Sequence, residues 1–223
     1  MLVKNEINGK TFEKLIDYAY DKCDYVSFKY YFEPFDFSFR KGMDVILSTS
    51  GFTKDDIIKN FSDSYLDKAY EYFKDNDKIF DETYLNDDSD IAEFRRLLAI
   101  KNSINMIFYN HVKEVFIEKF KHNLVSEQLI DVKEEDLFDR GILYIFKFNE
   151  EMKKEILTNK SLYDWCQPKY LDDIAFIKGN DYWLYSITSR EYCDILCENE
   201  KELEYLKTIG IEFKKDKFVS HNK

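Results

Sequence analysis

Three residues near the end of the chain have the types and order used by divalent-metal nucleases. Asp194 precedes the tripeptide Glu212-Phe213-Lys214. Enzymes of the restriction-endonuclease type place an acid on one strand and a Glu-x-Lys on the next, and together these groups hold a metal ion at the scissile phosphate. Those two strands are normally neighbours, whereas here a predicted helix over 198–208 separates them. A nuclease using Asp194, Glu212 and Lys214 is therefore an alternative hypothesis.

The remaining cysteines, histidines and clustered acids form no complete catalytic or metal-binding pattern. Cys193 and Cys197 are four residues apart, which on a strand means about 13 Å, too far to chelate one zinc ion. Cys166 would need His111 beside it in space to act as a nucleophile. The acid-rich stretch 75–90 lacks the glycine and the terminal glutamate of an EF-hand loop. We expect no metal and no cofactor.

Aromatic residues in the last third of the chain are the strongest binding signal. Trp165, Tyr170 and Trp183 lie close together in sequence, with Asp172 and Asp173 between them. Tryptophan and tyrosine are enriched at protein interfaces. We expect these aromatic side chains to be exposed and to contact a partner, while the two acids supply charge complementarity. The alternative is that they form the core, because an alternating strand must bury one face.

The elements that would position these residues follow from the hydrophobic pattern. Alternation through Ile174 and Phe176, and through Tyr182, Leu184 and Ser186, predicts a hairpin around Gly179-Asn180. A third strand near 192–196 and the helix over 198–208 complete a meander with a covering helix. Upstream, the pattern predicts a helix from Thr11, a strand over 25–32 and a long helix over 90–121.

These elements predict the α+β class: an antiparallel or mixed sheet with packed helices and a long helical insertion. The expected divisions are 1–50 (helix and aromatic strands), 51–138 (helical insertion with its acidic loop) and 139–223 (meander with covering helix). Whether the N-terminal and C-terminal strands share one sheet is left open.

Charge and composition restrict the function. A net charge of −11 argues against a general nucleic-acid binder, whose field must attract phosphates. It fits a basic protein partner, or simply solubility. The start of the chain has no secretory signal, and no apolar run approaches the ~18 residues of a membrane span. With four scattered cysteines, best interpreted as reduced thiols, we expect a cytoplasmic protein.

Several motifs within 161–213 carry a resemblance to known proteins: Leu162-Tyr163-Asp164-Trp165, Asp172-Asp173-Ile174-Ala175-Phe176, Trp183, Tyr192-Cys193-Asp194-Ile195 and the run 204–213. The segment resembles a group of small proteins from low-GC Gram-positive bacteria and their phages. Some of these are labelled stage III sporulation protein AH; the protein that properly bears this name is membrane-anchored, so the label is not transferred. Relatives often have histidine where Ser189 stands here. The resemblance therefore implies a structural or binding role and assigns no active-site residue.

Together these observations favour a non-enzymatic protein that binds another protein. We expect it to work in a phage–host conflict, as an inhibitor or as a defence or immunity component. Besides the nuclease, a second alternative is a binder of a small nucleotide signal, although the chain has no glycine-rich phosphate loop.

Overall fold

The structure is a computed structural model that describes residues 1–32, 108–134, 137–167 and 169–214. The chain divides into two compact units, one made of 1–32 and 116–223 and the other of 33–115. The sheet and most of the described residues belong to the first unit. The acidic stretch 75–90, the start of the long helix and the other elements predicted within 33–107 lie outside the described residues.

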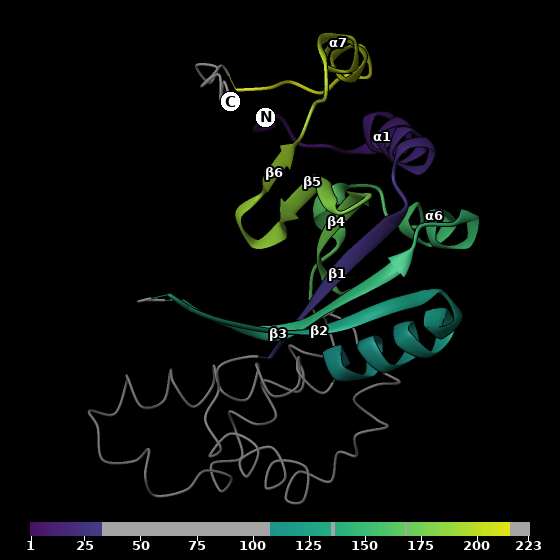
Figure 1. The fold of residues 1–223 in the computed structure, drawn as a ribbon, viewed down its shortest axis with the longest axis vertical. Coiled ribbons are helices and arrows are strands. Elements are labelled where there is room, and N and C mark those ends of the chain that lie inside the picture. Colours follow the sequence, from purple (N-terminus) through teal and green to yellow (C-terminus); the bar gives the residue numbers. More distant parts are fainter. Residues whose placement is uncertain (33–107, 135–136, 168, 215–223) are drawn as a thin grey trace, which may run out of the picture. The chain divides into compact units, whose positions relative to one another are not determined.

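The first unit is built on a six-stranded sheet in which every pairing is antiparallel (Figure 1). Its spatial order is β2-β3-β1-β4-β5-β6. The strands are β1 (Tyr25–Phe32), β2 (Leu124–Glu134), β3 (Leu137–Lys147), β4 (Asp172–Lys178), β5 (Asp181–Ile187) and β6 (Tyr192–Ile195). The helices α1 (Gly9–Lys22), α6 (Glu150–Ile156) and α7 (Glu200–Thr208), together with a helix over 108–120, complete the α+β fold.

Strand β1 joins the two ends of the chain in one sheet. It pairs with β3 on one side and with β4 on the other. Val26 lies opposite Phe146 in β3 and opposite Phe176 in β4, and all three side chains are buried. The N-terminal and C-terminal strands therefore share a single hydrophobic core, which answers the question that the sequence left open.

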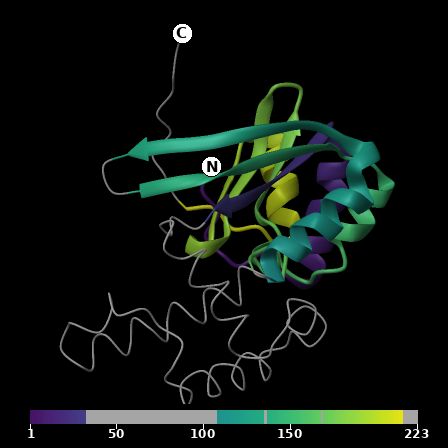
Figure 2. The same ribbon diagram turned by 90° about the horizontal axis from the view of Figure 1, so that it is seen from below.

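The described helices of this unit pack against the same face of the sheet, as Figures 1 and 2 show. From α1, Tyr20 meets Phe148 with ring centroids 5.6 Å apart. From the end of the helix over 108–120, Phe116 meets Phe28 at 5.3 Å. We call this side, which carries Val26 and Phe28, the helix face. The alternate residues of the strands, such as Tyr25 and Ser27, lie on the opposite side, which we call the open face because no described helix packs there.

Local polar contacts set the turn between β4 and β5 and the starts of the helices α7 and α1. Gly179 has a φ of +58°, the left-handed region that suits glycine, and its N–H donates to Asp24 Oδ2 at 2.8 Å. Asn199 caps α7 by accepting from Glu202 N at 3.0 Å. Helix α1 begins at Gly9 and not at Thr11, because Gly9 N donates to Lys160 O at 2.8 Å and so fixes where the chain enters the helix.

The predicted helical insertion ends earlier than position 138. The helix over 108–120 gives way to a short 3-10 turn (Lys121–Asn123), and β2 starts at Leu124. Leu124 pairs with Phe146 and Ile130 with Gly141, so β3 supplies hydrogen-bond partners that local sequence pattern does not reveal. In the described part of the chain, no helix combines the length and the apolarity that crossing a bilayer requires.

Candidate functional site

The two tryptophans predicted to be exposed are buried, so that expectation is wrong. Trp165 is 0% and Trp183 2% exposed. Trp165 packs between Phe28 and Tyr170, with ring centroids at 4.8 and 5.1 Å. Tyr170 is half-buried by this contact. Trp165 thus belongs to the core on the helix face, and only part of Tyr170 is available to a partner.

The two acids of the predicted binding set are also buried, because they hold loops in place. Asp172 Oδ1 accepts from Gln167 N at 3.1 Å. Asp173 Oδ1 accepts from Thr188 N at 2.8 Å, and its Oδ2 accepts from Tyr31 OH at 2.6 Å and Lys29 Nζ at 3.2 Å. With 6% and 3% exposure, neither acid offers its charge to a partner.

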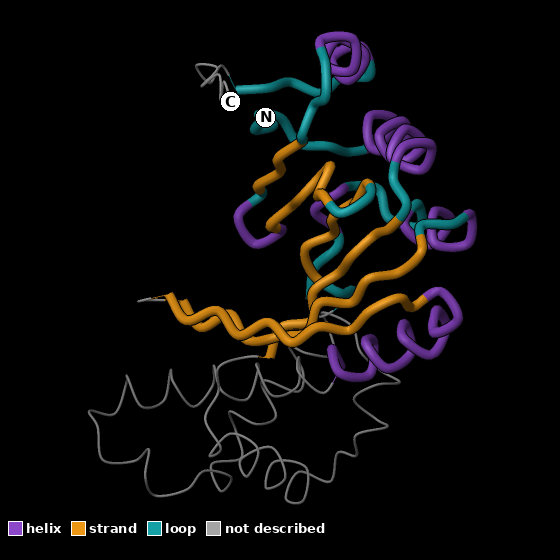
Figure 3. Tube along the Cα trace, in the orientation of Figure 1, coloured by secondary structure: helices purple, strands orange, loops and turns teal. Residues whose placement is uncertain are grey.

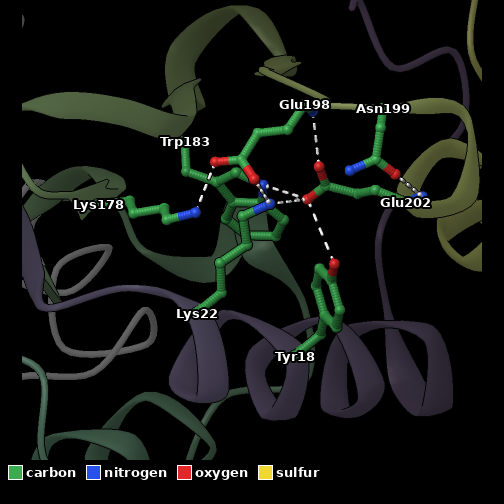
Figure 4. A network of polar contacts seen from close by, with 7 residues as sticks. All are labelled: Tyr18, Lys22, Lys178, Trp183, Glu198, Asn199 and Glu202. Carbon is green, nitrogen blue, oxygen red and sulfur yellow. Dashed lines mark hydrogen bonds and ion pairs between the residues drawn. The ribbon is translucent and has the colours of Figure 1, made fainter.

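Trp183 takes part in a buried polar network that docks α7 onto the sheet (Figure 4). Its Nε1 donates to Glu202 Oε1 at 2.8 Å. The same carboxylate accepts from Lys22 Nζ of α1, from Glu198 N at 2.7 Å and from Tyr18 OH at 3.4 Å. The side chain of Glu202 is 3% exposed, so one buried carboxylate joins α1, β5 and α7.

Electrostatics keep Glu202 ionised despite its burial. Burial by itself raises the pKa of this carboxyl, but the hydrogen bonds from Lys22, Glu198 N and Trp183 outweigh it, so the pKa lies below the ordinary 4.5. Lys22 also approaches Glu198 at 3.4 Å, and Glu198 pairs with Lys178 at 2.6 Å. Every charge in the network has an opposite partner. This arrangement is typical of a network that holds secondary-structure elements together.

The proposed nuclease residues are not on neighbouring strands. The segment 1–4 lies between them, with Leu2 bridged to Asp194 and Val3 bridged to Phe213 (Figure 3). Two strand spacings separate the backbones by about 10 Å, whereas an oxygen ligand lies about 2–2.6 Å from its ion. Asp194 binds the amino group of Met1, and Glu212 binds Lys4 at 3.3 Å. In the described residues, no group of three His, Cys, Asp or Glu side chains could hold a metal ion.

The cysteines are free thiols of low reactivity. Cys23 and Cys193 are buried, and Cys166 and Cys197 are half-buried. Burial raises the pKa of all four thiols, that of Cys23 to about 12. A nucleophilic cysteine requires the opposite shift.

The open face contains a groove that crosses the sheet. It has a volume of about 390 Å³, and its walls come from β1 to β5 and from the turn between β4 and β5. We define the groove by its ten lining residues: Tyr25, Val125, Ser126, Gln128, Leu143, Ile145, Ile177, Gly179, Asn180 and Tyr182. Tyr182 is 46% and Val125 49% exposed, so the outer walls of the groove are accessible.

A β-bulge lies in each of the two outer strands of the groove, and the one in β5 directs Tyr182 to the open face. In β5 the register shifts by one residue, so that Leu184 faces Phe176 on the helix face while Tyr182 faces Ile177 on the open face. Trp183 is the extra residue, and it points to Glu202. In β2 the register shifts between Leu124 and Ser126, at Val125. Bulges commonly re-aim side chains next to functional sites.

The groove has an uncharged lining. None of its ten lining residues is charged, although 35% of the chain is. Glu127 lies opposite Tyr144 and Asp181 lies opposite Lys178, so both acids belong to the helix-face side of the sheet although they adjoin lining residues in the sequence. Of the nearby bases, Lys178 is paired with Glu198 at 2.6 Å, and Lys147, opposite Tyr25 in the register, is exposed.

Sequence reasoning identified the aromatic strands but not this groove. Regular alternation puts Tyr182, Leu184 and Ser186 on one face, whereas the bulge separates Tyr182 from the other two. A usable signal was the absence of charge from 142–146, 174–177 and 182–187 in so charged a chain.

Comparison with protein-family models, curated proteins and solved structures found no match to the chain.

Proposed function

We propose that the chain works by binding a protein partner through the groove on its open face. The observation that carries this proposal is the uncharged lining of the groove, which combines two tyrosines with four aliphatic residues. Protein interfaces have this composition at their centre: charged residues are depleted and tyrosine is enriched, with a polar rim around them. Tyr25 and Tyr182 are the anchors, and Ser126, Gln128 and Asn180 supply polar rim contacts.

Charge favours a basic protein as the partner. A net charge of −11 attracts a positively charged protein over long distances and speeds its association. The same charge repels nucleic acids and a second copy of this chain.

The biological setting we propose is a phage–host conflict in the cytoplasm. The resemblance of 161–213 to proteins of low-GC Gram-positive bacteria and their phages motivates this setting. An inhibitor or an immunity component acts by occupying the surface of another protein, which requires a docking surface and no catalytic group. Four free cysteines are compatible with a reducing compartment.

Site-specific photocrosslinking tests the proposal with a matched pair of tyrosines. Tyr182 lies in the groove and is 46% exposed, whereas Tyr205 lies on α7 outside the groove and is 41% exposed. Each is replaced separately by p-benzoylphenylalanine, and cells that express the protein are irradiated with and without phage infection. Mass spectrometry identifies the crosslinked protein and the attached segment.

A defined protein that crosslinks from position 182 and not from position 205 is the expected result. The crosslink should weaken when Val125→Ser is added, because this change removes apolar area from the opposite wall of the groove. Identical crosslinks from both positions, or none from position 182, would refute binding through the groove.

A further inference from the structure

The two edges of the sheet end differently. Beyond β6, Leu2 bridges to Asp194 and Val3 bridges to Phe213, so two further segments of the chain cover that edge. On the other side β2 is the outermost strand, and among the described residues no segment pairs with its outer side. Native sheets usually shorten, cover or interrupt such an edge, because its backbone groups can recruit another strand. Strand β2 is 11 residues long and contains no proline.

The register shows which backbone groups of β2 point away from the sheet. Phe148 N donates to Asp24 O at 3.0 Å, and hydrogen-bonded pairs alternate along the antiparallel ladder from there. The even-numbered residues of β3 therefore direct their N–H and C=O groups to β1, and the odd-numbered residues direct theirs to β2. Gln128 lies opposite Leu143, so the even-numbered residues of β2 pair with β3. The odd-numbered residues of 127–133 direct a donor and an acceptor outward, where a further strand would lie.

An apolar side chain lies at the middle of this edge. Leu129 is 74% exposed, more than any other large hydrophobic side chain in the described part of the chain. In an added strand, the residue directly opposite Leu129 would cover it. Glu127 lies on the same side of β2 as Leu129, is exposed, and is the one charged residue of 124–130. An added strand therefore matches this edge best with an aliphatic residue opposite Leu129 and a basic residue opposite Glu127.

We infer that an extended segment of the partner protein adds to the sheet as a strand beside β2, with an aliphatic side chain opposite Leu129 and lysine or arginine opposite Glu127. Strand addition of this kind is a common mode of peptide recognition. The inference rests on the proposed function and names a second contact of the same partner. Val125, Ser126 and Gln128 of β2 line the groove, so a chain that leaves the groove over this wall reaches the edge. Seven paired residues would span about 24 Å.

Hydrogen exchange tests whether the edge is free in the unbound protein. The amides of Glu127 and Leu129 should exchange rapidly, whereas those of Ser126 and Gln128, which pair with β3, should be protected. Protection of 127 and 129 at every protein concentration would mean that another part of the chain covers the edge. Protection that grows with protein concentration would assign the edge to self-association. Either result would overturn the inference.

Photocrosslinking identifies the occupant. Leu129 is replaced by p-benzoylphenylalanine, and Leu196, which is 57% exposed and lies after β6, is the control position. The protein that crosslinks from position 182 should also crosslink from position 129, through one short segment, and not from position 196. A partner that crosslinks from 182 but not from 129 would overturn strand addition and leave the groove as the binding site. A partner that crosslinks from 129 alone would overturn the groove, and crosslinks from neither position would overturn both proposals.

The crosslinked segment, synthesised as a fluorescent peptide, tests the backbone pairing. Leu129→Pro removes an outward N–H without taking a hydrogen bond from the β2–β3 ladder, whereas Leu129→Ala removes only the apolar side chain. In fluorescence anisotropy with the full chain, the proline variant should bind about 2- to 12-fold more weakly than the alanine variant, the loss expected for one hydrogen bond. Circular dichroism checks that both variants are folded.

N-methylation of the peptide provides a second test that leaves the protein unchanged. One peptide carries methyl groups on its odd-numbered backbone nitrogens and the other on its even-numbered ones. Only one of the two sets faces β2 in an added strand, so only one peptide should lose binding. Equal loss with both peptides, or loss with neither, would overturn strand addition even if the segment binds.

Discussion

Replacing Glu202 should destabilise the fold more than replacing any exposed acid. This carboxylate is 3% exposed and accepts hydrogen bonds from α1, from β5 and from the backbone before α7. Glu202→Leu leaves the Lys22 ammonium, itself 11% exposed, without its closest partner. It also leaves Trp183 Nε1 without an acceptor.

The magnitude follows from the loss of the closer of the two carboxylates that Lys22 contacts, which leaves it only Glu198 at 3.4 Å. Removing one partner of a buried ion pair costs about 3–5 kcal/mol, a large part of the roughly 5–15 kcal/mol that stabilises a typical domain. Glu202→Gln keeps an acceptor for Trp183 but loses the charge that Lys22 requires, so we expect about 1–3 kcal/mol. Urea denaturation monitored by tryptophan fluorescence measures the unfolding free energy of both variants, because the two tryptophans of the chain are buried.

A double-mutant cycle with Lys22 isolates the ion pair. Lys22→Met removes the ammonium that Glu202→Leu leaves without its closest partner, so the double variant Lys22→Met, Glu202→Leu should be less destabilised than the sum of the two single variants. As a control, Glu204→Gln breaks an exposed pair with Lys207 and should cost less than about 1 kcal/mol. If the losses in unfolding free energy were strictly additive in the cycle, or if Glu202→Leu cost as little as Glu204→Gln, Glu202 would not be the buried carboxylate that links α1, β5 and α7.

The pKa shift gives the same prediction a pH dependence. Since the pKa of Glu202 in the fold lies below its ordinary 4.5, the ionised carboxylate stabilises the fold at pH values above 4.5. That contribution is lost as the pH falls through the folded pKa. The difference in unfolding free energy between the wild type and Glu202→Gln should therefore be largest above pH 4.5 and shrink as the pH falls through the folded pKa, as unfolding curves at a series of acidic pH values would measure.

Two further predictions concern the thiols and the sheet. Because burial raises their pKa values, Cys23 and Cys193 should react with Ellman's reagent at pH 8 only after unfolding in urea; rapid reaction of the native protein would contradict their burial. Gly141→Ala should cost at least about 1–3 kcal/mol in denaturation, because the new Cβ would lie 2.4 Å from Tyr30 O of the paired strand. Gly179→Asn, at a position with no atom near the added Cβ and a φ that asparagine tolerates, is its matched control, and an equal loss there would contradict this explanation.

Much of the fold could be predicted from local pattern. Strand β1 has the bounds predicted for it, and the meander and its covering helix lie where the alternation placed them. Local pattern failed where a distant partner decides the structure. Residues 124–134 form a strand because β3 pairs with them. The hydrophobic pattern within that segment does not predict this pairing.

The site was harder to predict because alternation defines two faces without saying which one helices will cover. Trp165 and Trp183 have the composition of an interface, yet α1, α7 and the end of the helix over 108–120 need apolar partners and bury them. Bulges are equally hidden, since one extra residue in β5 reverses the side of Tyr182 relative to Leu184. Position in the register, and not residue type, separates the exposed tyrosine from the buried tryptophan.

The two bulges also bear on which side chains form the outer walls of the groove. Each bulge leaves one residue outside the ladder and disrupts the pairing locally. A regular β5 would place Tyr182 on the helix face with Leu184. Val125 would lie on the open face even in a regular strand, since Leu124 before it lies opposite Phe146 on the helix face. Both side chains form the outer walls of one uncharged groove on the open face. The bulge in β5 is thus what brings Tyr182 to the open face, and because this exposed side chain does not fill the core, core packing does not explain the irregularity.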